Sequence, residues 1–211
     1  MKVLVIGANG QVGKQLVELL GKSEHEVTAM VRDTDQIPTM EKLSAKTVTG
    51  NLEKDFSHAV AGADAVIFTA GSGAHTGYDK TILIDQEGAI KAMDTAKSLG
   101  VKRFIMLSSI IPKRLADAPE SMKPYYAAKN RADEYLKGTN LDYTIVRPGR
   151  LTNEPGSGKI DAAVSLGYKS SIPRADVAHV LFETLEQENT YSKTFEILSG
   201  DDSISKALRN V

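Results

Sequence analysis

The chain has 211 residues, and its 26 Lys and Arg side chains nearly balance 27 Asp and Glu, leaving a formal charge of −1. With 41% hydrophobic and 25% charged residues, the composition excludes disordered and collagen-like chains. A pI of about 6.4 provides no basic field, so we expect neither nucleic acid nor a membrane as partner. Cysteine is absent, which excludes disulfides and thiol nucleophiles. The apolar run at residues 3–6 is too short for a signal peptide, so we predict a cytoplasmic protein.

Short apolar runs alternate with longer amphipathic stretches, the rhythm of βαβ units on a parallel sheet. The predicted strands are residues 2–6, 26–31, 46–49, 65–68, 103–107 and 143–146. The predicted helices are one that ends at Gly21, then residues 52–61, 80–99, 125–137 and 174–185. Residues 195–198 are expected to form a final edge strand.

These elements predict an α/β fold, a Rossmann-like, doubly wound parallel sheet with helices on both faces. We find no internal repeat or low-complexity linker, so residues 1–211 are predicted to form a single domain. Residues 151–211 partly complete the sheet and contribute a small substrate-side region. The substrate pocket is therefore expected to be small or partly open.

A glycine turn, Gly7-Ala8-Asn9-Gly10-Gln11-Val12-Gly13, lies between the first strand and the first helix. Such a turn lets the backbone approach a pyrophosphate, and the helix N-terminus adds amide donors and a positive dipole. A phosphate-binding loop of the NTPase type is disfavoured, because Ala8 and Gln15 occupy positions that require glycine and a hydroxyl residue. A tight turn without a ligand remains the alternative.

Two further pairs of candidate site residues are expected at the carboxyl ends of the predicted strands. Tyr125 and Lys129 are spaced i and i+4 on one helix face, so the ammonium can stabilise the phenolate of a phenol whose pKa is otherwise about 10. Ser108 and Ser109 end the fifth strand, at the edge where open α/β sheets bind ligands. The alternatives are a surface helix and strand-end serines that satisfy local backbone groups.

Together these motifs resemble the short-chain dehydrogenase/reductase superfamily over essentially the whole chain, and more narrowly its atypical NAD(P)-binding members related to NmrA-like proteins and NAD-dependent epimerase/dehydratases. The resemblance implies NAD(P) contacts at the following residues: Gly7, Asn9, Gly10, Gln11, Val12, Gly13, Arg32, Asn51, Leu52, Ala70, Gly71, Ser108, Lys129, Pro148, Gly149 and Leu151. Val31 occupies the acidic position that would hold a ribose 2′-hydroxyl, and Arg32 beside it suits a 2′-phosphate. We therefore favour NADP over NAD, although Arg32 paired with Asp33 is the alternative.

The resemblance also implies catalytic roles. Tyr125 passes a proton, Lys129 tunes it and holds the nicotinamide ribose, and Ser109 orients the substrate oxygen, with Ser108 as the fallback. The family pattern Asn-x-x-Gly is replaced by Asp85-Gln86-Glu87-Gly88, which puts the proton relay in doubt; Asp85 is alternatively a solvated or capping helix residue. The four histidines lack metal-ligand spacing, so we predict no metal site.

The sequence thus favours an NADP-dependent oxidoreductase acting on a small carbonyl, alcohol or quinone-like molecule. An NmrA-like redox sensor without robust turnover is one alternative, and a sugar-nucleotide epimerase or dehydratase is another. Arg174 and Asp176 are expected to cap the last helix or form an ion pair. Four side chains are candidates for the pocket mouth: His75, Tyr78, Arg150 and Tyr168. Substrate identity and the choice between monomer and homo-oligomer stay open.

Overall fold

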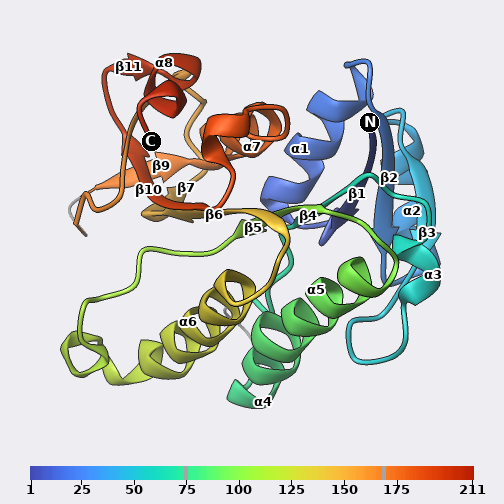
Figure 1. The fold of residues 1–211 in the computed structure, drawn as a ribbon, viewed down its shortest axis with the longest axis horizontal. Coiled ribbons are helices and arrows are strands. Elements are labelled where there is room, and N and C mark those ends of the chain that lie inside the picture. Colours follow the sequence, from blue (N-terminus) through green and yellow to red (C-terminus); the bar gives the residue numbers. More distant parts are fainter. Residues whose placement is uncertain (74–75, 168–169) are drawn as a thin grey trace.

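The computed structural model describes residues 1–73, 76–167 and 170–211, and within them a nine-stranded sheet crosses the molecule (Figure 1). From edge to edge the strands are β11 (Asp202–Ser203), β8 (Lys159–Ala163), β10 (Lys193–Ser199), β6 (Asp142–Pro148), β5 (Arg103–Leu107), β4 (Ala65–Phe68), β1 (Lys2–Ile6), β2 (Glu26–Val31) and β3 (Lys46–Thr49). Every pairing from β10 to β3 is parallel, whereas β8 runs antiparallel to β10 and β11. The predicted Rossmann-like, doubly wound fold is confirmed.

Helices cover both faces of this sheet (Figure 1). The α-helices are α1 (Gln11–Gly21), α2 (Ile37–Glu41), α3 (Ser57–Val60), α4 (Tyr78–Lys80), α5 (Ala89–Ser98), α6 (Lys123–Lys137), α7 (Arg174–Glu183) and α8 (Ile204–Arg209). Val3 and Val5 belong to the core cluster that contains residues of α1 and α7, whereas Leu4 and Ile6 belong to the cluster with residues of α3 and α5. Because both faces are covered, the central strands are buried along nearly their whole length, which explains their continuous apolar sequences.

The C-terminal part of the sheet differs from the prediction. Residues 195–198 do not form an edge strand: β10 lies inside the sheet, between β6 and β8. The edge is supplied by β8 and β11, and a separate two-stranded sheet joins β7 (Arg150–Thr152) to β9 (Ser171–Pro173). The predicted helix over residues 174–185 is confirmed as α7, and α8 follows it.

The segment predicted as one long helix over residues 80–99 contains an unexpected geometry. After α4, residues Thr81–Gly88 form a π-helix, and α5 continues from Ala89. A π-helical insertion shifts the direction of the side chains that follow and is often found at functional sites. Here it carries Asp85, whose side chain is buried.

The strand order also determines where a ligand-binding crevice lies, at the carboxyl ends of β1 and β4. The chain fills β1, β2 and β3 toward one edge, then crosses back to β4 and continues toward the other edge. Ligands of open α/β sheets bind beyond the carboxyl ends of the strands at such a switch point. The glycine turn after β1 and the small-residue segment after β4 meet there.

Candidate functional site

The glycine turn is held against the end of β4 by close backbone contacts. Gly7 has φ +88°, and a Cβ there would lie 2.5 Å from the Ala70 nitrogen. At Gly13 a Cβ would lie 2.3 Å from the carbonyl oxygen of Gly7. Both positions therefore require glycine, and their small size brings α1 close to β1. This arrangement points the N-terminus of α1 at the crevice, where its amides and dipole favour a phosphate.

Two adjoining cavities form a continuous cleft along this crevice. The larger, about 720 Å³, extends from the glycine turn to α6, and the smaller, about 460 Å³, extends toward β2 and β3. Both are lined by Gly10 and by the segment Thr69, Ala70, Gly71 and Ser72. A cleft with two lobes on either side of a phosphate-binding turn has the shape that a dinucleotide requires.

Nearly all residues expected to bind NAD(P) are brought together by the fold. Those that line the cleft are Gly7, Asn9, Gly10, Gln11, Val12, Arg32, Asn51, Leu52, Ala70, Gly71, Ser108, Lys129, Pro148, Gly149 and Leu151. Gly13 does not line it, because its place is at the contact between α1 and β1. Tyr125 and Ser109 line the larger cavity.

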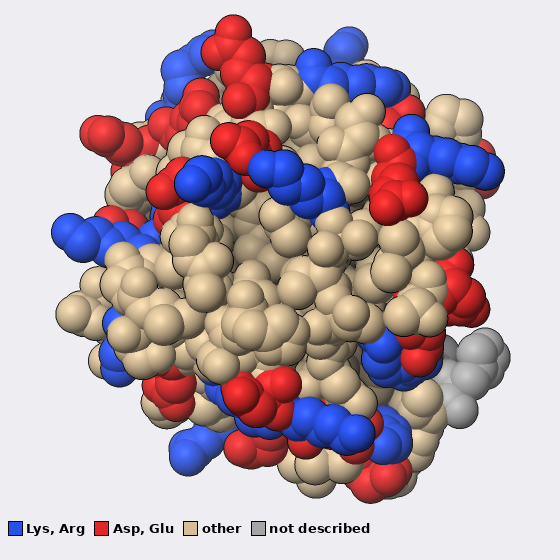
Figure 2. Space-filling view, turned by 90° about the vertical axis from the view of Figure 1, so that its right-hand side faces the viewer, with Lys and Arg blue, Asp and Glu red and all other residues tan. Residues whose placement is uncertain are grey.

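The smaller cavity carries the residues expected to recognise the adenosine half. Arg32 follows buried Val31, and its side chain is 71% exposed, with Nε donating a hydrogen bond of 3.1 Å to Asp33. The side chain is thus at the rim and paired with a neighbour that is itself exposed. The side-chain oxygen of Asn51 accepts a hydrogen bond of 2.9 Å from the Glu53 amide, so its amino group and the second lone pair of that oxygen are left for a ligand. Seen from the side in Figure 2, charges of both signs are interspersed around a hollow in the surface.

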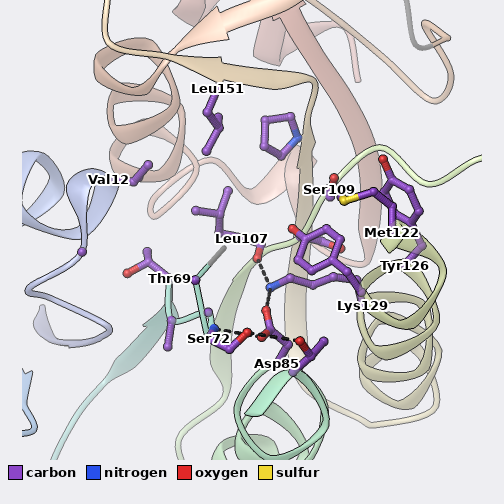
Figure 3. A pocket seen from close by; sticks show the side chains of 18 of the residues that line it. Val12, Thr69, Ser72, Asp85, Leu107, Ser109, Met122, Tyr126, Lys129 and Leu151 are labelled. Atoms are coloured by element: carbon purple, nitrogen blue, oxygen red, sulfur yellow. Dashed lines mark hydrogen bonds and ion pairs between the residues drawn. The ribbon is translucent and has the colours of Figure 1, made fainter. Parts of the chain in front are cut away.

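The larger cavity contains a buried ion pair. Lys129, 3% exposed, extends from α6 so that its Nζ lies 3.2 Å from Oδ1 of Asp85, which is 1% exposed (Figure 3). The same Nζ lies 3.5 Å from the Leu107 carbonyl oxygen and 5.8 Å from the centre of the Tyr125 ring. Oδ2 of Asp85 accepts the Ser72 amide at 2.9 Å. Asp85 is therefore neither solvated nor a helix cap, and through Lys129 and Ser72 it joins α6 to the loop after β4.

The charge state of Lys129 follows from these neighbours. Burial disfavours the ammonium, but the nearby Tyr125 and the Asp85 and Asp133 carboxylates outweigh it and raise the pKa of Lys129. Lys129 is consequently a cation at neutral pH. Because the ammonium of Lys129 contacts the carboxylate of Asp85, the Lys129–Asp85 pair as a whole is close to neutral.

The two serines at the end of β5 have different surroundings. The Ser108 hydroxyl donates a 2.8 Å hydrogen bond to Asp133, which is fully buried and also bonded by Arg147 at 2.8 Å. Burial raises the pKa of Asp133, while Arg147 and Ser108 act in the opposite direction. Ser109 is half-buried beside the cavity, near Met122 and Tyr126 (Figure 3). Of the two hydroxyls, the one not committed to a buried carboxylate belongs to Ser109.

Several lining residues carried no clear sequence signal. Among the described residues, Arg174 neither caps α7 nor forms an ion pair; it donates a 2.8 Å hydrogen bond to Asn153 and lines the larger cavity. Asp176 instead accepts backbone amides of Ser157 and Gly158, and Arg150 lines the same cavity as Arg174. The positions of Arg150 and Arg174 depend on the pairing of β7 with β9, which no local sequence pattern predicts. Tyr78 also lines it, whereas His75 and Tyr168 lie outside the described residues.

The described residues offer no candidate for a membrane span or a metal site. In the part of the chain that the structure describes, no helix is long and apolar enough to cross a membrane. Across those same residues, no group of three or more acidic or histidine side chains is placed to hold a metal ion.

Comparison with known proteins agrees with this geometry. Residues 7–188 match the NAD(P)H-binding family. The chain is 45% identical over 215 residues to the uncharacterized sugar epimerase YhfK of Bacillus subtilis, with 100% of both chains covered. A Bacillus halodurans protein described as an NAD-dependent epimerase/dehydratase superposes with a TM-score of 0.97 at 48% identity, again with 100% of both chains covered. The oxidoreductase ylbE of Lactococcus lactis gives a TM-score of 0.89 at 33% identity, covering 100% of this chain and 96% of that one. The chain therefore belongs to the NAD(P)H-binding family and has an NAD(P)-binding, oxidoreductase-like Rossmann fold, consistent with an atypical short-chain dehydrogenase/reductase.

Proposed function

We propose that the protein is an NADP-dependent reductase of a small carbonyl or quinone-like substrate. One observation carries the proposal: a single cleft connects the glycine turn and Arg32 in one lobe to Tyr125, Lys129 and Ser109 in the other. The first group suits a nucleotide phosphate, and the second suits proton transfer to a developing alkoxide. An enzyme that reduces a carbonyl with a bound nucleotide needs both functions in one cleft.

The residues have separable tasks. Bound NADPH would supply a hydride to the substrate carbon. The N-terminus of α1 and Gly10 would hold the diphosphate, and Pro148, Gly149 and Leu151, which line the larger cavity, would contact the nicotinamide half. Tyr125 donates its phenolic proton to the substrate oxygen, and Ser109 orients that oxygen by a hydrogen bond. Lys129 would hold the ribose, and it places a positive charge near the phenol of Tyr125.

The names of relatives support the redox class. The sanguinarine reductase of Eschscholzia californica is 25% identical over 195 residues, which cover 87% of this chain and 69% of that protein. The Lactococcus lactis relative is described as an oxidoreductase. Neither name transfers a substrate to this chain.

The preference for NADPH is expected to depend on Arg32. Its guanidinium borders the smaller cavity, where a 2′-phosphate would replace Asp33 as its partner. We expect Arg32→Ala to weaken NADPH binding about 10-fold or more, the loss of one charge-assisted pair, and to leave NADH affinity within about 2-fold. Calorimetric titration of both nucleotides measures this ratio. Equal losses for NADPH and NADH would show that Arg32 does not read the phosphate.

A sugar-nucleotide epimerase or dehydratase is the second candidate, because one similar protein is named a sugar epimerase and another is described as an NAD-dependent epimerase/dehydratase. Such an enzyme oxidises and re-reduces its substrate without net consumption of nucleotide. Incubation with a carbonyl and quinone panel and with a nucleotide-sugar panel separates the two. NADPH consumption supports the reductase, and sugar isomers formed without it support the epimerase. Nucleotide binding with neither reaction would support the NmrA-like sensor.

A further inference from the structure

The Asp85–Lys129 ion pair is the most deeply buried charge pair of the larger cavity. Both side chains are at most 4% exposed, and the carboxylate is anchored on its other side by the Ser72 amide. The π-helix that carries Asp85 packs closely against α6, which carries Lys129. The pair is thus fixed by two elements and a loop.

The charged groups around Lys129 contribute to the electric field at Tyr125, together with Arg150 and Arg174, which line the same cavity. From α6 itself come Tyr125 and Asp133, from the π-helix comes Asp85, and from β5 comes the Leu107 carbonyl. Asp133 is in turn paired with Arg147 of β6, so its charge is largely compensated locally. The carboxylate in direct contact with the ammonium is that of Asp85.

An ammonium beside a phenol promotes loss of the phenolic proton, because it stabilises the phenolate. A carboxylate in contact with the same ammonium opposes this effect, since its own charge repels the phenolate. In a buried site the interaction is poorly screened by water and salt. The Asp85 carboxylate therefore reduces the influence of Lys129 on the phenol.

We propose that Asp85 is a positioning residue that keeps Tyr125 in its protonated, proton-donating form and thereby biases the site toward reduction. This inference rests on the proposed function. It concerns the phenolic proton of Tyr125 and not the binding of the nucleotide. In each turnover the phenolic O–H bond breaks, its proton passes to the substrate oxygen, and the phenolate regains a proton from water. The carboxylate itself gains and loses no proton.

The test titrates Tyr125 directly by the near-ultraviolet absorbance of tyrosinate. Tyr125→Phe subtracted from wild type isolates the Tyr125 signal, and the same subtraction is made in the Asp85→Asn background. We expect Asp85→Asn to move the Tyr125 transition to lower pH by about one unit or more. The exposed Asp161→Asn, on β8, is the matched control and leaves the transition in place. An unchanged transition, or one moved upward, overturns the proposal.

A titration of the wild type alone and a kinetic assay complement this test, so that it can be decided even if Asp85→Asn does not fold or the protein shows no turnover. Should Asp85→Asn not fold, wild type alone decides: the proposal requires Tyr125 to lose its proton only above about pH 9, near the ordinary phenol range, and a transition below about pH 8 overturns it. Where wild type reduces the probe menadione with NADPH, the alkaline fall in kcat/KM shifts downward in Asp85→Asn by the same amount as the absorbance transition. Absence of menadione reduction contradicts the choice of substrate class and leaves the titration result standing by itself.

Discussion

Replacing Tyr125 by phenylalanine is expected to lower the turnover number about 100-fold to 10,000-fold, because positioned proton donors contribute rate factors of that size. The side chain lines the larger cavity one helical turn from Lys129, and the substitution removes only the hydroxyl. NADPH affinity is expected to change by less than about 3-fold, since the phenol is not among the residues that hold the phosphates. Steady-state kinetics with the best substrate of the carbonyl and quinone panel, together with calorimetry, measures both quantities.

Tyr135→Phe provides the control for this experiment. Tyr135 lies on the same helix α6, and its hydroxyl donates a 2.7 Å hydrogen bond to Asp94 at the exposed side. The same chemical change there is expected to leave kcat within about 2-fold of wild type. Full activity of Tyr125→Phe would remove Tyr125 from the mechanism and transfer the proton-donor role to another group.

Replacing Lys129 by methionine is expected to destabilise the fold by about 3–5 kcal/mol, because it leaves the Asp85 carboxylate buried without its counter-charge. The cost arises from the unpaired charge, since methionine fills nearly the same volume as the lysine stem. Chemical denaturation followed by circular dichroism measures the free energy of unfolding. Lys97→Met, at the exposed end of α5, is the control and is expected to change it by less than about 0.5 kcal/mol.

The double variant Lys129→Met with Asp85→Asn separates charge from packing. Removing both charges eliminates the uncompensated carboxylate, so the double variant is expected to be more stable than Lys129→Met alone. A double variant as unstable as the sum of the two single variants would contradict the ion-pair account. In that case the buried pair would contribute packing rather than electrostatic stabilisation.

The central sheet could be predicted from sequence because its strands are buried on both faces. Residues 65–68, for example, are apolar without interruption and are bounded by small or polar residues, and the strand appears at those positions. The strands at the C-terminal edge, β8 and β11, could not be predicted, because they depend on pairing partners rather than on their own sequence. Lys159–Ala163 is short and lacks strict alternation, and its strand conformation depends on antiparallel pairing with β10, which is distant in sequence. Because β8 is not predicted, the sequence places β10 at the edge of the sheet, whereas it lies between β6 and β8.

The candidate site shows the same division. The glycine turn and the Tyr125–Lys129 spacing are local patterns, so the sequence placed them correctly on a strand-to-helix turn and on one helix. The partner of Asp85 could not be predicted, because it depends on a π-helix and on packing against α6. The difference between the two serines could not be predicted either. It arises because the Ser108 hydroxyl donates a hydrogen bond to Asp133, which Arg147 also contacts.

Calorimetric titration of the wild-type protein with NADPH tests the central claim most directly. The two-lobed cleft beside the glycine turn predicts one NADPH bound per chain, more tightly than NADH. A single binding event of this kind would support the cleft as the nucleotide site on which both proposals depend. No measurable binding of either nucleotide would contradict the account, because the cleft would then lack the ligand that its glycine turn is built to hold.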